Sequence, residues 1–389
     1  MISEDEFHKM RYRLLLQAFL FVSLFVAKSA MAEEIDVWIG TSNNKASQGI
    51  YHCLLDTEAG KLSPSKLVAE IRGPGFLAMH PSRPVLYAVG TLEGTPSVVA
   101  YSIEGTGKKA SLKLINALPI GDGGAAHVSV DPTGRLLLTA QYGGGSTGAF
   151  KLNEDGSLHS QTMLRDHTAM PAKVVGNRQD APHAHWTGFA PDNRFAFVPD
   201  LGLDKVVIYK TNFETTALEH HGYGAVPPGG GPRHMKFHPE TSDIYVLNEL
   251  ELTISVFDYD AETGSMTRKQ DIPTVSKEEK DQEIFKSCSE IRVHPNGKFV
   301  YAANRGHDTI TVFRIGNKGL LEEVQNEHVR GATPRNFNIT PDGKWLLAAG
   351  QDSHTLACFA VNDSTGRITY NRSIISTPAP ICVLFQYEK

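Results

Sequence analysis

Residues 236–260, KFHPETSDIYVLNELELTISVFDYD, hold the pattern that decides the fold. A short apolar segment ends at the turn His238-Pro239, and a second apolar run covers residues 244–248. A polar loop then leads to residues 253–259, in which apolar and polar side chains alternate. Runs this short, bounded by turn residues and without helical periodicity, predict β-strands.

The same order of features recurs along the chain. In six segments a proline-containing turn separates two short apolar strands, and a polar loop leads to a third strand. The turns contain Pro81, Pro132, Pro191, Pro239, Pro295 and Pro341. Consecutive prolines are 46 to 59 residues apart, which leaves room for a fourth strand in each unit. Repeats of this length built from four short strands predict the blades of a β-propeller.

The two ends of the chain complement each other. Residues 379–385, APICVLF, have the pattern of a first strand with no unit after it, whereas residues 36–56 supply later strands without a first one. Joining them in one blade closes the ring and removes open sheet edges. We therefore predict an all-β fold, a seven-bladed β-propeller with four-stranded antiparallel blades, over residues 33–389. Two packed β-sandwiches, the alternative architecture, would not explain the complementary ends.

The N-terminal segment has the features of a secretory signal peptide. Three basic residues between positions 9 and 13 precede an apolar run at 14–26, and small residues occupy the positions before a cut after Ala32. The run is shorter than the roughly 20 residues of a membrane-spanning helix. We expect residues 1–32 to be removed and the protein to be exported to the periplasm or outside the cell, without stable membrane insertion. An uncleaved segment would instead anchor it to the membrane.

Composition narrows the possible partners. The chain is 41% hydrophobic and 21% charged, as in ordinary globular proteins. Its net charge of −5 does not indicate nucleic-acid binding, which calls for a basic surface. A monomer that binds a small molecule is expected. The cysteines lie in or beside apolar runs, which favours core packing, although an exported protein can oxidise one pair; they are Cys53, Cys288, Cys358 and Cys382.

Strand direction predicts where the candidate functional residues lie together. Because a blade is antiparallel, the segment that leads into its first strand and the loop after its second strand lie at the same end of the channel. Histidines, arginines and a carboxylate occupy these two sets of positions: His127, His183, His185, Arg233, His234 and Arg335 in the first set, and Glu249, Arg305 and His307 in the second. Such a ring of polar groups around a concave mouth is the default hypothesis for a binding site.

Four stretches resemble the propeller-type 6-phosphogluconolactonases, whose superfamily also holds the eukaryotic carboxymuconate cyclases. They are PHAHWTGFAPD (182–192), GPRHMKFHP (231–239), YVLNEL (245–250) and YAANRGHDTITVF (301–313). The resemblance spans nearly all of the chain after the signal segment and implies a seven-bladed propeller. It also implies a catalytic set, which is His185, Arg233, Glu249 and Arg305. Gly90-Thr91 and Pro199-Asp200 depart from the family's usual residues, so the lactone that is recognised stays open.

Each residue of this set has an expected role. His185 is the candidate general base for a water molecule, because imidazole titrates near neutral pH. Arg233 and Arg305 have guanidinium groups suited to hold a substrate anion and to stabilise an oxyanion. Glu249 is expected to orient them rather than to act as a base, since neighbouring arginines lower its pKa. The other rim residues are expected at the substrate or in support of it: His127, His183, His234, His307 and Arg335.

The sequence therefore predicts hydrolysis of a sugar lactone bearing an anionic group, with 6-phosphogluconolactone to 6-phosphogluconate as the named reaction. No metal and no cofactor are expected. A zinc or calcium ion on His183, His185 and Asp200 or Glu249 is the alternative that we weighed, but the nearby arginines oppose a cation. Two further readings stay open: a lactone-forming enzyme like the carboxymuconate cyclases, and a non-catalytic scaffold with YVTN-type repeats, which YAANRGHDTITVF also resembles.

Overall fold

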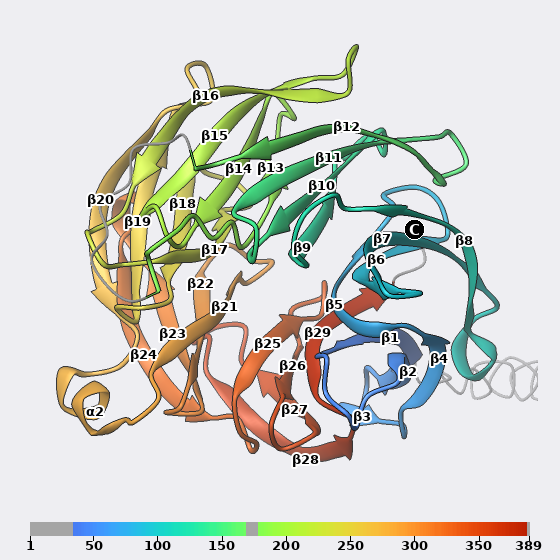
Figure 1. Cartoon of the computed structure of the whole chain (residues 1–389). Helices are drawn as coiled ribbons and strands as arrows, with labels where there is room; N and C mark the ends of the chain where they lie inside the picture. Colours follow the sequence, from blue (N-terminus) through green and yellow to red (C-terminus); the bar gives the residue numbers. More distant parts are fainter. Residues whose placement is uncertain (1–33, 169–177, 387–389) are drawn as a thin grey trace, which may run out of the picture. The chain divides into compact units, whose positions relative to one another are not determined.

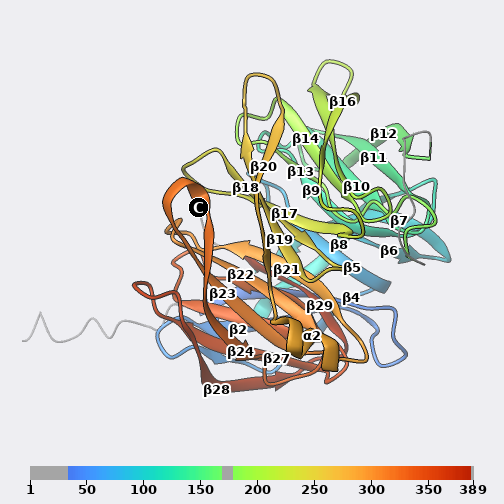
Figure 2. The same cartoon turned by 90° about the vertical axis from the view of Figure 1, so that its left-hand side faces the viewer.

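The computed structural model describes residues 34–168 and 178–386, and it confirms the predicted seven-bladed β-propeller. Seven antiparallel sheets follow one another around a ring, with the first strand of each sheet nearest the centre (Figure 1). The same ring is seen from the side in Figure 2. The predicted signal peptide lies outside the described residues. Within the described ranges, no helix is both long and apolar enough for a membrane span.

The strands of six blades are consecutive in sequence. Blade 1 consists of β5 (Arg72–Met79), β6 (Val85–Leu92), β7 (Thr95–Glu104) and β8 (Ser111–Pro119). Blade 2 consists of β9 (Ala125–Val130), β10 (Leu136–Gln141), β11 (Ser146–Leu152) and β12 (Leu158–Asp166). Blade 3 consists of β13 (Gly188–Phe189), β14 (Phe195–Asp200), β15 (Lys205–Asn212) and β16 (Ala217–Ala225). Blade 4 consists of β17 (Pro232–Phe237), β18 (Asp243–Asn248), β19 (Thr253–Tyr259) and β20 (Met266–Pro273). Blade 5 consists of β21 (Ser287–Val293), β22 (Phe299–Arg305), β23 (Thr309–Ile315) and β24 (Leu321–His328). Blade 6 consists of β25 (Pro334–Ile339), β26 (Trp345–Gly350), β27 (Thr355–Val361) and β28 (Ile368–Ser376).

Blade 7 joins the two ends of the described chain, as predicted. Its first strand is β29 (Pro380–Gln386), which pairs antiparallel with β1 (Glu34–Thr41), for example through Trp38 and Leu384. Its outer strands are β2 (Gly49–Asp56), β3 (Lys61–Leu62) and β4 (Lys66–Glu70). The ring therefore closes through hydrogen bonds between segments that are more than 300 residues apart.

The histidine before the repeat proline ties neighbouring blades together. In blade 5 the Nδ1 of His294 accepts a hydrogen bond from the backbone N–H of Asn296 at 3.2 Å. Its Nε2 must then carry the proton, and it donates to the carbonyl of Gly343 in blade 6 at 3.0 Å. His238 makes the same pair of contacts with its own turn and with Gly297. The histidine of the repeated His-Pro pattern thus forms a hydrogen bond to the next blade, and this bond recurs around the ring.

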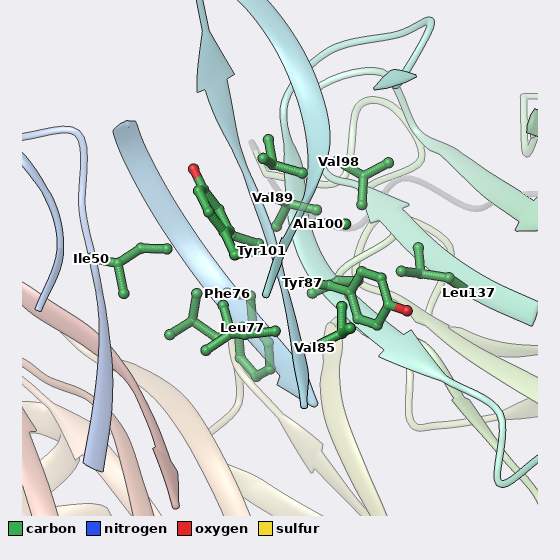
Figure 3. Packing of buried hydrophobic residues seen from close by; sticks show 14 of the residues in the cluster. Ile50, Phe76, Leu77, Val85, Tyr87, Val89, Val98, Ala100, Tyr101 and Leu137 are labelled. Atoms are coloured by element: carbon green, nitrogen blue, oxygen red, sulfur yellow. The ribbon is translucent and has the colours of Figure 1, made fainter. Parts of the chain in front are cut away.

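Apolar side chains fill the space between blades. Figure 3 shows one such cluster, in which Ile50 of blade 7 and Leu137 of blade 2 lie on either side of the blade 1 side chains. Tyr87 of blade 1 is fully buried there, and its hydroxyl donates to the carbonyl of Gly156 in blade 2 at 2.5 Å. All four cysteines are buried as free thiols, as expected for core packing.

Candidate active site

A buried carboxylate surrounded by guanidinium groups lies where the second strands of blades 4 and 5 end. Glu249 directly follows β18 and is only 1% exposed. Its Oε1 accepts hydrogen bonds from Arg178 at 2.7 Å and Ser287 at 2.8 Å, and lies 2.9 Å from Nη2 of Arg305. Its Oε2 forms an ion pair with Nε of Arg233 at 2.9 Å. The structure therefore brings together three of the four residues predicted as catalytic.

A glycine loop sets the position of Arg233. Gly231 has φ +64, in the left-handed region that favours glycine. The Asp204 carboxylate accepts hydrogen bonds from the backbone N–H groups of Gly229 at 2.7 Å and Gly231 at 2.9 Å. The Gly231 carbonyl in turn accepts from the backbone N–H of Glu249 at 2.7 Å. The chain thus fixes the arginine and the carboxylate of blade 4 to the same loop.

Blade 5 holds Arg305 from two sides. Arg305 ends β22, and its Nη2 donates to Ser287 Oγ at 2.6 Å and to the carbonyl of Cys288 at 2.9 Å. Its guanidinium group also lies 5.7 Å from the ring centre of Phe285. Since both hydrogen-bond partners belong to the first strand of the same blade, the guanidinium group has a single orientation toward Glu249.

Arg178 is a site residue that the sequence reasoning missed. Its side chain is 40% exposed, and besides Glu249 it hydrogen-bonds the hydroxyl of Tyr142 at 2.9 Å. The next residue, Gln179, is buried and donates to Asp204 at 2.6 Å. The one available signal was the spacing of 59 residues between Pro132 and Pro191, which exceeds the other spacings and marks an inserted loop.

His185 lies in an irregular segment at the start of blade 3. Ala184 forms an isolated bridge with Asp200, and regular pairing resumes only at Gly188. The His185 ring packs edge-on against His234 at 5.3 Å and against Tyr142 at 5.4 Å. Its Nδ1 is buried and has no hydrogen-bond partner among the described residues. Burial, with the positive charge of Arg233 next, holds the pKa of His185 well below its usual value, so that the imidazole is neutral at pH 7.

Three other predicted rim residues have different surroundings. His183 stacks on the Tyr142 ring at 4.5 Å and hydrogen-bonds its carbonyl at 2.8 Å, so it supports that ring. His307 hydrogen-bonds Thr309 and lies 3.8 Å from Glu279 of the short helix α2 (Lys277–Gln282), which places it toward the edge of the site. Arg335 is the second residue of β25, and burial followed by the charge of Arg305 lowers its pKa to about 10.

His127 and His234 lie deeper in the channel than predicted. His234 follows Arg233 in β17, and its Nε2 lies 3.1 Å from Nη1 of that arginine. Its Nδ1 lies 3.2 Å from Oε1 of Glu290, which is fully buried. His127 packs against the rings of His234 at 5.5 Å and Phe76 at 4.0 Å. Both histidines thus lie beneath the arginines and the carboxylate rather than on the rim.

The charges of the site do not balance. Burial raises the pKa of Glu249, but the charges of Arg305 and Arg233 outweigh it and hold that pKa well below its ordinary value. Burial lowers the pKa of Arg233 to about 9, which still leaves it charged at pH 7. Four guanidinium groups, those of Arg178, Arg233, Arg305 and Arg335, therefore act on one carboxylate. A cluster with this surplus of positive charge favours an anionic ligand.

The residues that the sequence offered as metal ligands have other partners in the structure. In the described part of the chain, no group of three His, Cys, Asp or Glu side chains is arranged to hold a metal ion. Of the ligands weighed from the sequence, Asp200 is already bonded to His167 at 2.8 Å and to the backbone N–H of His183 at 2.8 Å. Both oxygens of Glu249 face guanidinium groups, which repel a cation.

Known proteins share this architecture. The sequence matches the family described as "Lactonase, 7-bladed beta-propeller" over residues 36–385. It is 34% identical over 352 residues to the 6-phosphogluconolactonase of Bacillus subtilis (strain 168), a match that covers 90% of this chain and 98% of that protein.

Solved structures agree with the sequence matches. A protein from Lactobacillus plantarum superposes with a TM-score of 0.85 at 28% identity, over 91% of this chain and 100% of that one. The periplasmic gluconolactonase of Pseudomonas aeruginosa superposes with a TM-score of 0.83 at 25% identity, over 91% of this chain and 99% of that one. The chain therefore belongs to the lactonase family of seven-bladed β-propellers.

Proposed function

We propose that the protein is an exported, metal-independent lactonase whose substrate carries an anionic group, with 6-phosphogluconolactone as the first candidate. The names of its relatives in Bacillus subtilis and Pseudomonas aeruginosa support lactone hydrolysis at the level of the family. The observation that carries the choice of an anionic substrate is the surplus of guanidinium groups around Glu249. A neutral sugar lactone would leave this surplus uncompensated.

We assign a role to each arginine from how deeply its side chain is buried. Arg233 and Arg305 are almost fully buried against Glu249, so they are preorganised to stabilise the oxyanion that forms at the lactone carbonyl. Arg178 lies further toward solvent, and we assign to it and to Arg335 the binding of the phosphate or carboxylate of the substrate. Glu249 keeps these side chains oriented. It is a weak base because its own pKa is depressed.

His185 completes the reaction. Its neutral imidazole takes a proton from a water molecule, whose oxygen forms a bond to the carbonyl carbon of the lactone. The bond from that carbon to the ring oxygen then breaks, and the ring oxygen receives the proton back from the imidazolium. One water is consumed and one hydroxy acid is formed, with no change in oxidation state. The same groups can serve the reverse, lactone-forming direction, which keeps a cyclase-like activity as the second candidate.

A substrate panel tests this proposal. We expect 6-phosphogluconolactone to be hydrolysed with a kcat/KM at least about 10-fold above that of gluconolactone, since charge-assisted hydrogen bonds contribute roughly 1.5–3 kcal/mol each. Carboxymuconolactone tests the cyclase-like alternative, and parallel assays with EDTA test metal dependence. Arg335→Gln should reduce the preference for the phosphorylated lactone, whereas exposed Arg165→Gln should not.

Each part of the proposed function would be contradicted by a different result. Equal kcat/KM for both sugar lactones would contradict recognition of an anion, and loss of activity in EDTA would contradict the metal-free mechanism. No turnover of any lactone, together with capture of a protein partner, would favour the scaffold.

Export is proposed from residues 1–32 together with the periplasmic relative. We expect the protein recovered from its native cells to lie outside the cytoplasm and to begin at residue 33, because cleavage is expected after Ala32. Cell fractionation followed by N-terminal sequencing measures both. A full-length chain in the cytoplasmic fraction would contradict the proposal.

A further inference from the structure

The central channel is blocked beneath the candidate active site. Side chains of a strand alternate between its two faces, so every second residue of a first strand shares one direction. Five such residues from different blades contact one another across the centre: Phe76, His127, His234, Glu290 and Asn336. All are at most 9% exposed. We call this layer the plug, and it separates the two ends of the channel.

A cavity opens on the far side of the plug from the candidate active site. It has a volume of about 440 Å³, within the usual range for small-molecule sites of roughly 300–1,000 Å³. Its lining includes the residues that lie two positions beyond the plug in their strands: Ala78, Ser129, Lys236, Arg292 and Asn338. Lys236 is three residues beyond Arg233 in β17, which at about 3.3 Å per residue places it roughly 10 Å along the strand from the catalytic arginine.

Two cations in this cavity lack strong partners. Among the described residues Lys236 has no hydrogen bond or ion pair, and its ammonium group lies 4.9 Å from the ring centre of Trp186. Nη2 of Arg292 reaches the plug residue Glu290 only at 3.5 Å. Burial, with the charge of Arg292 next, lowers the pKa of Lys236 to about 7. Glu290 supplies one negative charge to these two cations, so an anionic ligand would complete the charge balance of the cavity.

The remaining walls are apolar. Trp186, Phe189 and Phe237 contribute aromatic surface, and Val383 and Leu384 contribute aliphatic surface. Phe189 and Phe237 are only partly buried, although both belong to first strands at the centre of the ring. Apolar walls with two convergent cations suit a ligand with one anionic end and an apolar body. A highly hydrated, multiply charged phosphate fits such walls less well, because it would lose its hydration without enough donors to replace it.

We propose that this cavity is a second binding site, distinct from the candidate active site, for a small monocarboxylate with a flat apolar body. The carboxylate lies between Lys236 and Arg292, and the body lies against the aromatic wall formed by Trp186, Phe189 and Phe237. The inference does not depend on the proposed lactonase activity, because the plug separates the two sites.

Calorimetric titration with benzoate tests the site. We expect benzoate to bind the wild-type protein at least about 10-fold more tightly than the neutral benzyl alcohol of similar shape, because only benzoate offers a charge to the two cations. Lys236→Met should weaken benzoate binding at least about 10-fold. Lys210→Met, which removes an exposed lysine of β15, should leave it unchanged. Arg335→Gln should also leave it unchanged, since that arginine belongs to the candidate active site.

Three results would overturn the proposal. They are equal benzoate affinity of Lys236→Met and wild type, loss of benzoate binding in Arg335→Gln, and displacement of benzoate by equimolar inorganic phosphate. Should Lys236→Met fail to fold, a crystal structure of the wild-type protein with benzoate decides, because the ligand must lie between Lys236 and Arg292 and not at Glu249.

Discussion

Replacing Glu249 by glutamine is expected to lower kcat/KM by about 10³ and the free energy of unfolding by about 3–5 kcal/mol. Removal of one partner from a buried ion pair leaves uncompensated charge, and here Arg233 and Arg305 both lose theirs. Loss of a single preorganised oxyanion donor costs about 10²–10³ in kcat, and Glu249→Gln frees two donors to move. Urea unfolding followed by circular dichroism measures the change in the free energy of unfolding, and steady-state kinetics on the best lactone of the panel measures the change in kcat/KM.

A nearby carboxylate provides the matched control. Glu251 is about half exposed and pairs with Lys280 at 2.7 Å on the surface. Glu251→Gln should therefore change the free energy of unfolding by less than about 1 kcal/mol and leave kcat/KM near the wild-type value. If Glu249 moved the proton itself, the glutamine variant would also lose the acidic limb of the pH–rate profile. A positioning role predicts that the profile keeps its shape at a lower rate.

The fold could be predicted because its signals are local and repeated. The His-Pro turn has one function in each blade where it occurs, as His238 and His294 show, so each copy marks the same place in a blade. The shared face of Arg233 and Glu249 followed from antiparallel pairing alone. Their blade could be identified because glycines precede β17 and Pro232 begins it.

Side-chain direction within the first strands could not be predicted. The pairing of β17 with β18 shifts register between Pro232 and His234, and the pairing of β21 with β22 shifts between Cys288 and Ile291. An irregularity of this kind reverses which alternate residues face the channel. For this reason the position of a residue in an entry segment, such as His234, did not reveal how deep in the channel its side chain lies.

Arg178 escaped prediction for a different reason. It belongs to an irregular loop between blades 2 and 3, where neither period nor motif gives a position in space. Its place is set by long-range contacts, those of Gln179 with Asp204 and Leu201, and of Arg178 itself with Tyr142. Contacts of that kind depend on the closed ring and leave no local pattern in sequence.

His185→Ala is expected to lower kcat by about 10²–10⁴ with a much smaller change in KM, which is the usual contribution of a general base. The reason is that the ring acts on water in the transition state, whereas the arginines hold the substrate. His183→Ala is the matched control, because that ring supports Tyr142 instead, and we expect it to lower kcat less than about 10-fold. A His185→Ala variant within about threefold of wild type would contradict the assignment.

The pH dependence of the wild-type enzyme gives a second, independent check on His185. Burial and the charge of Arg233 lower the pKa of His185 well below the ordinary value of 6.5. A base is active when unprotonated, so lowering its pKa extends the active form to more acidic pH. The kcat/KM should therefore stay level as pH falls through 6.5 and decline only well below it. A profile that halves near pH 6.5 would mean that the base titrates as an ordinary, solvated histidine, which this buried ring is not.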